Sequence, residues 1–138
     1  MTATPTRVAQ LPDSMAHPVG HYSHAIVSGN QLFVSGLLAL DEKGALVGAR
    51  DAGAQAAFIF ATLKLILAAE AAGLNHVVKL NLYLLDLADR AAVNDARRSA
   101  FGDWRPASTL VKVAGLIGEG TLLEVEAVAV ITPSSEKE

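Results

Sequence analysis

Residues 121–131 read Thr-Leu-Leu-Glu-Val-Glu-Ala-Val-Ala-Val-Ile, and their alternation is the strongest indication of the fold. Successive side chains of a β-strand point to opposite faces of the sheet. The odd-numbered positions from 123 to 131 are all aliphatic, whereas the even-numbered positions from 122 to 130 mix aliphatic residues with Glu124 and Glu126. We therefore expect a strand that covers a core with one face and presents a half-polar surface with the other.

Two further stretches, residues 77–85 and 107–113, also alternate as strands. In the first, the even-numbered positions from Val78 to Leu84 are aliphatic and the odd-numbered positions are mixed. The aliphatic faces are expected to meet helices. The opposite faces should form one mixed surface that comprises Lys79, Tyr83, Leu110, Leu122, Glu124, Glu126, Val128 and Val130.

Turn residues and caps place the remaining elements. Residues 24–28 and 31–35 are two β-type runs joined at Gly29-Asn30, which predicts a tight hairpin. Apolar residues at helical spacing predict a helix over residues 51–72, with Asp51 as its N-cap and Gly73 as its left-handed end residue. A second helix is expected over residues 89–101, followed by Gly102.

The predicted order is β-β-α-β-α-β-β, which favours an α+β fold with one mixed sheet and both helices on one face. The second face of that sheet is too apolar to be left against water and too polar for the core of a monomer. A second copy of the chain would cover it. The sequence therefore predicts a closed homo-oligomer.

The composition limits the class of protein. The chain has 138 residues, 51% of them hydrophobic and 18% charged, which fits a single domain over residues 1–138 with loose ends at about 1–18 and 133–138. It has no cysteine, which excludes a disulfide scaffold and a thiolate metal site. The net charge of −3 argues against a nucleic-acid partner. We see no targeting segment and no membrane span, and expect a soluble, cytoplasmic protein.

Several short motifs fall on these elements in a fixed order. They are Pro18-Val-Gly-His-Tyr-Ser-His-Ala25, Ser28-Gly-Asn-Gln-Leu-Phe-Val-Ser-Gly36, Gln55 with Ala71-Ala-Gly73, Val77-Val-Lys79, Tyr83-Leu-Leu-Asp-Leu87, Asn94, Pro106-Ala107 and Leu123-Glu-Val-Glu-Ala-Val-Ala129. Over roughly residues 18–131 they resemble the motifs of the RidA (YjgF-type) family of small trimeric proteins. Their order and spacing together carry the resemblance.

The resemblance implies a chorismate-mutase-like fold and a homotrimer that holds a small-molecule ligand in clefts between its subunits. Typical members hydrolyse reactive enamines and imines left by pyridoxal-phosphate enzymes, and release ammonia and a keto acid. They need no cofactor, and we expect neither a cofactor nor a metal ion here.

The chain departs from the family pattern at Ser108. The family reads P-A-R-(S/T), and its arginine grips the substrate carboxylate, whereas this sequence reads Pro106-Ala-Ser-Thr109. A guanidinium can form two parallel charge-assisted bonds with a carboxylate, but a hydroxyl offers one neutral bond. We therefore expect a less cationic, more apolar cleft and a substrate other than the usual 2-aminoacrylate type.

The resemblance also assigns candidate site residues. Glu124 matches the family acid that positions water or exchanges protons, and Tyr22 matches a hydrogen-bond donor to a carbonyl or imine. We take these two as catalytic. The expected substrate-binding residues are Ser108, Asn94, Ser35, Leu110 and His21.

Structural roles for the same residues stay open. Glu124 could be a solvated carboxylate or a member of a salt bridge between subunits, and Tyr22 could be an interface ring. Ser35 and Asn94 could be turn or cap residues. Four arginines are interpreted as a solvated basic surface: Arg90, Arg97, Arg98 and Arg105.

Three functions are compatible with these residues. The leading hypothesis is cofactor-free processing of a small reactive enamine or imine, by hydrolytic deamination or proton transfer. The second is a trimeric module that binds a small metabolite or acts in regulation without turnover. The third is a ribonuclease, which the net charge and the 5% aromatic content disfavour.

Overall fold

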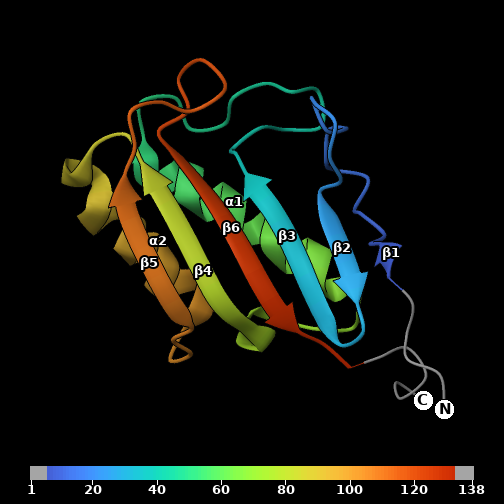
Figure 1. The fold of residues 1–138 in the computed structure, drawn as a ribbon. Helices are drawn as coiled ribbons and strands as arrows, with labels where there is room; N and C mark the ends of the chain where they lie inside the picture. Colours follow the sequence, from blue (N-terminus) through green and yellow to red (C-terminus); the bar gives the residue numbers. More distant parts are fainter. Residues whose placement is uncertain (1–5, 133–138) are drawn as a thin grey trace, which may run out of the picture.

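The computed structural model describes residues 6–132, which form a mixed six-stranded sheet and two helices (Figure 1). The strands follow the spatial order β1-β2-β3-β6-β4-β5. Only β4 and β5 pair in parallel; the other neighbours are antiparallel. The elements are β1 (Arg7–Val8), β2 (Ala25–Ser28), β3 (Gln31–Leu37), α1 (Ala52–Ala68), β4 (Val77–Leu84), α2 (Arg90–Phe101), β5 (Ala107–Lys112) and β6 (Leu123–Val130), with 3-10 turns at Leu74–His76 and Leu87–Asp89.

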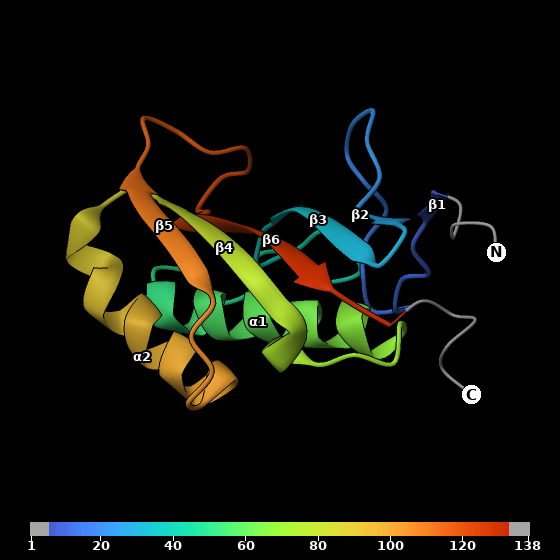
Figure 2. The ribbon, with the colours of Figure 1, turned by 60° about the horizontal axis from the view of Figure 1, so that its bottom comes forward.

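Both helices cover one face of the sheet, as predicted (Figure 2). The aliphatic faces of the two middle strands pair across the sheet, with Leu82 opposite Val125 and Leu84 opposite Leu123. These side chains are fully buried, as are Ile59, Phe60, Leu63, Ile66 and Leu67 of α1. The alternation in residues 121–131 therefore defines the core, because β6 lies in the middle of the sheet.

The predicted hairpin is confirmed. Ser28 pairs with Gln31 at the closing position, and Gly29 has φ 62°, a conformation that glycine adopts without a steric penalty. The N-terminal segment adds order that the sequence did not predict, since β1 pairs with β2. A bidentate ion pair also holds it, because Arg7 donates to the buried Glu70 at 2.6 and 3.1 Å. Residues 1–5 and 133–138, where loose ends were also expected, lie outside the described range.

The first helix begins as predicted but ends earlier. The Asp51 side chain accepts a hydrogen bond from the backbone N–H of Ala54 at 3.0 Å. The helix ends at Ala68, and Ala71 takes the left-handed conformation with φ 55°, while Gly73 is extended. The prediction for Gly73 was therefore wrong. A hydrogen bond from the Ala72 N–H to the Leu67 carbonyl closes this end, as in a Schellman motif.

The register of β4 changes near its start. Pairing with β6 shifts between Val77 and Lys79, and this leaves Val77 buried and Val78 41% exposed. The prediction that Val78 faces the helices was wrong, because the irregularity reverses the alternation at this residue. Trp104 lies at the same place, and its indole N–H donates to the Val77 carbonyl at 2.8 Å.

The faces of β5 also differ from the expectation for Leu110. This residue pairs with Leu82, and Ser108 pairs with Leu80, so both lie on the helix face of the sheet. The predicted grouping of Leu110 with Glu124 and Tyr83 was wrong. The cause is the edge position of β5, where both faces are largely exposed and alternation does not separate inside from outside.

The outer face of the sheet is mixed, as predicted. Phe33, Val111 and Val130 are 40–42% exposed on it. Polar partners lie between them: Glu126 accepts hydrogen bonds from the Tyr83 hydroxyl and, at 2.9 Å, from the Asn81 amide. In residues 6–132 the chain has no helix that is both long and apolar enough to cross a membrane.

Candidate functional site

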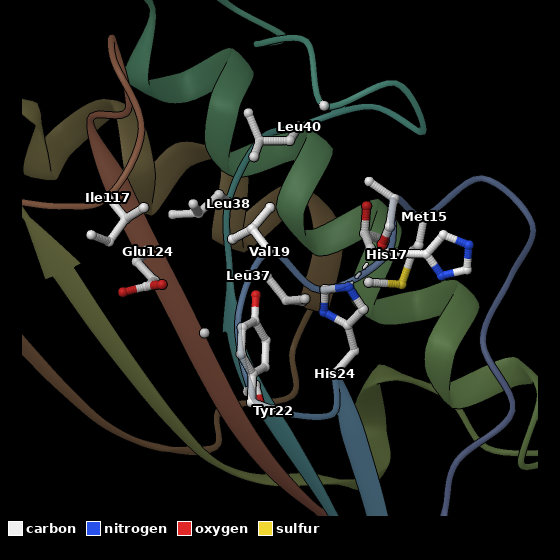
Figure 3. A pocket seen from close by; sticks show the side chains of 15 residues that line it. Met15, His17, Val19, Tyr22, His24, Leu37, Leu38, Leu40, Ile117 and Glu124 are labelled. Carbon is white, nitrogen blue, oxygen red and sulfur yellow. Dashed lines mark hydrogen bonds between the residues drawn. The ribbon is translucent and has the colours of Figure 1, made fainter.

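A pocket of about 360 Å³ lies where the loop before β2 meets β3 and β6 (Figure 3). Glu124, Tyr22 and Ser35 line it, so three of the predicted site residues come together there. The rest of its wall is mostly apolar and comprises Met15, Ala16, His17, Val19, His24, Gly36, Leu37, Leu38, Leu40, Gly44, Thr62 and Ile117. The pocket is open to a small molecule and carries one acid.

Glu124 projects from β6 into this pocket (Figure 3). Burial raises the pKa of its carboxyl above the usual value, and the nearby charge of Glu126 raises it further. Gly36 makes room for it, because a Cβ atom there would stand 2.5 Å from Glu124 Oε2. A half-buried acid whose pKa is raised holds its proton more readily than an ordinary glutamate, which suits general acid–base chemistry.

Tyr22 is 44% exposed, and its ring also points into the pocket (Figure 3). The ring meets that of His24 edge-on, with centroids 5.8 Å apart. His24 is fixed in turn, since its Nε2 lies 2.8 Å from the carbonyl oxygen of Ala16. The tyrosine hydroxyl is therefore presented to the pocket by a loop that its neighbours hold in place.

Two other predicted residues near this loop behave differently. The Ser35 hydroxyl donates to the Ser23 carbonyl at 2.7 Å, so it ties β3 to the loop that carries Tyr22. His21 is exposed and is not among the residues that line the pocket. Sequence reasoning gave no specific role to His24, and the Tyr22-Ser-His24 spacing alone could not have shown its contact with Ala16.

Ser108, Asn94 and Leu110 line a second hollow of about 520 Å³, between α2 and β5. Arg97 Nη1 donates to Ser108 Oγ at 3.1 Å. Burial, and secondarily the charge of Arg90, lowers the pKa of Arg97. The interpretation of Arg97 as part of a solvated surface was therefore wrong, because the β4-α2-β5 connection turns this side chain onto the strand.

The two groups of predicted site residues do not meet within one chain. Glu124 pairs with Tyr83 on the outer face of the sheet, whereas Ser108 pairs with Leu80 on the helix face. Strand β4 also separates β6 from β5. One ligand cannot touch both groups in a single subunit.

Comparison with known proteins assigns the chain to a protein family. The family model described as Endoribonuclease L-PSP matches residues 13–131. The chain belongs to this family, which is the RidA (YjgF) family that its motifs resemble.

Relatives and solved structures agree with this assignment. The chain is 35% identical to the 3-aminoacrylate deaminase RutC of Acinetobacter baylyi over 119 residues, which are 86% of this chain and 94% of that protein. It is 37% identical to a RutC family protein of Pyrococcus horikoshii, over 81% of this chain and 88% of that one. The crystal structure of RidA from an Antarctic Psychrobacter superposes with a TM-score of 0.82 at 35% identity, and covers 91% of this chain and 99% of its own. The fold is thus the chorismate-mutase-like fold of RidA proteins.

In this RidA-family chain a buried glutamine also links α1 to two loops, and the sequence did not predict these contacts. Gln55 of α1 is fully buried, and its amide donates to the carbonyls of Gly48 at 3.0 Å and Gly120 at 3.1 Å. Its Oε1 accepts from the Leu122 N–H at 2.9 Å. The three bonds attach the loop at Gly48 and the loop at Gly120 to α1. They also fix the backbone at Leu122, which directly precedes β6 and lies two residues before Glu124. One signal of this structural role was present in the sequence, because Gln55 is a polar residue among the apolar residues of the predicted helix.

The described acidic and histidine side chains do not form a metal-binding group. In residues 6–132 no three His, Asp or Glu residues lie close enough together to hold an ion. His21 and His24, which are three positions apart, belong to an extended loop in which His24 is engaged by Ala16.

Proposed function

We propose that this protein is a cofactor-independent hydrolase of small reactive imines and enamines, with Glu124 as its acid–base residue. Family membership supports this, since relatives bear the names 3-aminoacrylate deaminase and, in Dermatophagoides farinae, 2-iminobutanoate/2-iminopropanoate deaminase. The observation that carries the proposal is the Glu124 carboxyl, half-buried with a raised pKa, at the wall of a ligand-sized pocket.

The chemistry requires proton transfers and one water molecule. An enamine takes a proton at carbon to give an iminium ion, which loses a proton from nitrogen and becomes the imine. Water then adds to the C=N carbon, and one of its protons passes to nitrogen to give a carbinolamine. The amino group takes a further proton, the C–N bond breaks to release ammonia, and the hydroxyl loses its proton to leave a carbonyl. Glu124 would remove the proton from the attacking water and return it to the leaving nitrogen. The Tyr22 hydroxyl would donate a hydrogen bond to the substrate and hold it beside the acid.

A second copy of the chain would complete the site. Glu124 and Ser108 lie on opposite faces within one subunit, and the exposed side chains of Phe33, Val111 and Val130 leave the outer face uncovered. A homotrimer, which the family resemblance implies, would bring the Ser108 group of one subunit to the Glu124 pocket of the next. Such an assembly would measure about 43 kDa, from three chains of 14.4 kDa.

The substrate is proposed to differ from 2-aminoacrylate. Residue 108 is a serine, so the charged grip that the resemblance implies at this position of β5 is absent. Asn94 and Leu110 would line the same end of the ligand. His21, exposed outside the first pocket, would reach a ligand only at the rim of the assembled site.

The test is ammonia release from enzymatically generated 2-iminopropanoate and 3-aminoacrylate, compared with the uncatalysed rate. Glu124→Gln should lower turnover by roughly 100-fold or more, the range of general acid–base catalysis. Glu119→Gln, an exposed loop residue, is the matched control and should retain full rate. Faster turnover of 2-iminopropanoate than of 3-aminoacrylate would contradict the proposed substrate preference, and turnover of both at background level would contradict the deaminase proposal. Saturable binding without turnover would favour a binding module, and cleavage of RNA would favour a nuclease.

A further inference from the structure

The three arginines of α2 have different environments. Arg98 is exposed and pairs with Asp95 at 2.9 Å, one turn away on the same helix. Arg97 is instead turned onto β5, where its Nη1 donates to Ser108 Oγ. Its Nε is buried and has no hydrogen-bond partner in the described part of the chain. Buried donors in folded proteins nearly always have a hydrogen-bond partner, so the hydrogen bonding of the Arg97 guanidinium is incomplete in the single chain.

The surroundings of Arg97 do not compensate its charge. Among residues 6–132 no carboxylate forms an ion pair with Arg97 or Arg90, and both arginines line the same hollow. Burial and the neighbouring positive charge of Arg90 both oppose the charged form of Arg97, which lowers its pKa. A half-buried cation beside a like charge and without a counter-ion is unfavourable for the isolated chain. An anion in the hollow would offset both effects by its attraction to the charged form.

The hollow suits a small carboxylate. Besides the two arginines it presents the Ser108 hydroxyl and the Asn94 side chain, and its apolar wall comes from Leu87 and Leu110. A guanidinium has five N–H donors in a planar fork, and the bond to Ser108 uses only one of them. The remaining donors can form paired bonds with the two oxygens of a carboxylate.

We propose that Arg97, held in place by Ser108 and assisted by Arg90, binds the carboxylate of the ligand. The inference deepens the proposed function, on which it rests for the identity of the site, and it names the substrate class as a small organic acid. It also revises the expectation of a less cationic cleft, because the cation comes from α2 rather than from position 108 of β5. A carboxylate held from α2 lies differently from one held by the strand, which fits a substrate other than 2-aminoacrylate.

The experiment compares stable ligands rather than reactive substrates. Binding of 2-oxobutanoate and of its neutral amide, 2-oxobutanamide, to the full-length assembly is followed by NMR titration. Arg97→Met should weaken the carboxylate by roughly 10- to 100-fold, as expected for loss of a charge-assisted pair, and leave the amide unchanged. Arg97→Lys should recover part of the affinity, since lysine restores the positive charge but not the planar pair of N–H donors. Arg98→Met is the matched control and should bind both ligands as the wild type does.

Further measurements separate the possible failures. Size-exclusion chromatography with light scattering and thermal melting should show that Arg97→Met keeps its assembly and its stability. Equal affinity of wild type and Arg97→Met for the carboxylate would overturn the inference, as would dissociation of the assembly, which would mean that Arg97 pairs with an acid of another copy. Glu124→Gln should keep its affinity for the carboxylate while losing turnover. Arg97-dependent binding without any turnover would refute the proposed function alone, and Glu124-dependent turnover without Arg97-dependent binding would refute this inference alone.

Discussion

Replacing Gln55 by leucine tests how the fold positions Glu124, the proposed catalytic acid. The change keeps the side-chain volume nearly constant and removes all three hydrogen bonds that Gln55 makes with Gly48, Gly120 and Leu122. We expect a less stable protein and a slower enzyme, because the loop before β6 loses its attachment to α1.

The size of the effect follows from these partners. A buried polar group left without a partner costs about 1–3 kcal/mol. The Leu122 N–H is only partly accessible and would lose its partner, so it should cost at least the lower value. The Gly48 carbonyl still accepts from the Asp51 N–H at 3.0 Å, and Gly120 is exposed, so its carbonyl can be rehydrated. Better burial of leucine offsets part of this loss. The free energy of unfolding should fall by about 1–3 kcal/mol for Gln55→Leu.

Urea denaturation at one fixed protein concentration measures the change, because the stability of the proposed oligomer would depend on concentration. Thr62→Val is the matched control on the same helix. The Thr62 hydroxyl donates to the Phe58 carbonyl one turn away, and its loss should change stability by under about 1 kcal/mol. Gln55→Glu adds a pH test. The introduced carboxylate would face two carbonyl oxygens, so its pKa should rise and its variant should lose stability as pH rises from 4 toward neutrality. An unfolding free energy for Gln55→Leu within about 0.5 kcal/mol of wild type would refute the reasoning.

Three further substitutions test separate features. Gly36→Ala should displace the Glu124 carboxylate and lower turnover by roughly 10- to 100-fold with little change in melting temperature, whereas full activity would show that the close approach is unimportant. Ala71→Gly should raise the unfolding free energy by about 1 kcal/mol, because it relieves the left-handed conformation, and Ala69→Gly, in right-handed helical geometry, should lower it; equal effects would contradict this account. Glu124→Gln should be more stable than wild type at neutral pH, since the folded state disfavours the carboxylate. That advantage should vanish as pH falls through the raised pKa, and a pH-independent difference in denaturation would argue against the electrostatic cause.

The elements set by local chemistry could be predicted from the sequence. The hairpin at Gly29-Asn30, the N-cap at Asp51 and the two faces of β6 all depend on turn propensity, capping and alternation, which act within a few residues. The grouping of Glu124 with Tyr22 came from the family motifs, and the structure places both in one pocket.

The features set by contacts between distant segments could not be predicted. The end of α1 was missed for a different, local reason, because the helix closes through a left-handed alanine, Ala71, rather than at the nearest glycine. The orientation of Leu110 depends on which strand pairs with β5, and an exposed edge strand carries no alternation that would reveal it. The contact of Arg97 with Ser108 requires α2 to cross from β4 to β5, so residues 11 positions apart meet although neither belongs to a local motif.

The most direct test mixes two inactive variants. Glu124→Gln disables the acid, and Ser108→Trp fills the hollow between α2 and β5 while leaving the acid intact. If each site combines Glu124 of one subunit with Ser108 of the next, random mixing of the two chains by co-expression should restore about one quarter of the wild-type rate of ammonia release, because one seam in four receives both intact residues. If the mixed protein stays as inactive as either variant alone, the site does not form between copies and the account is wrong.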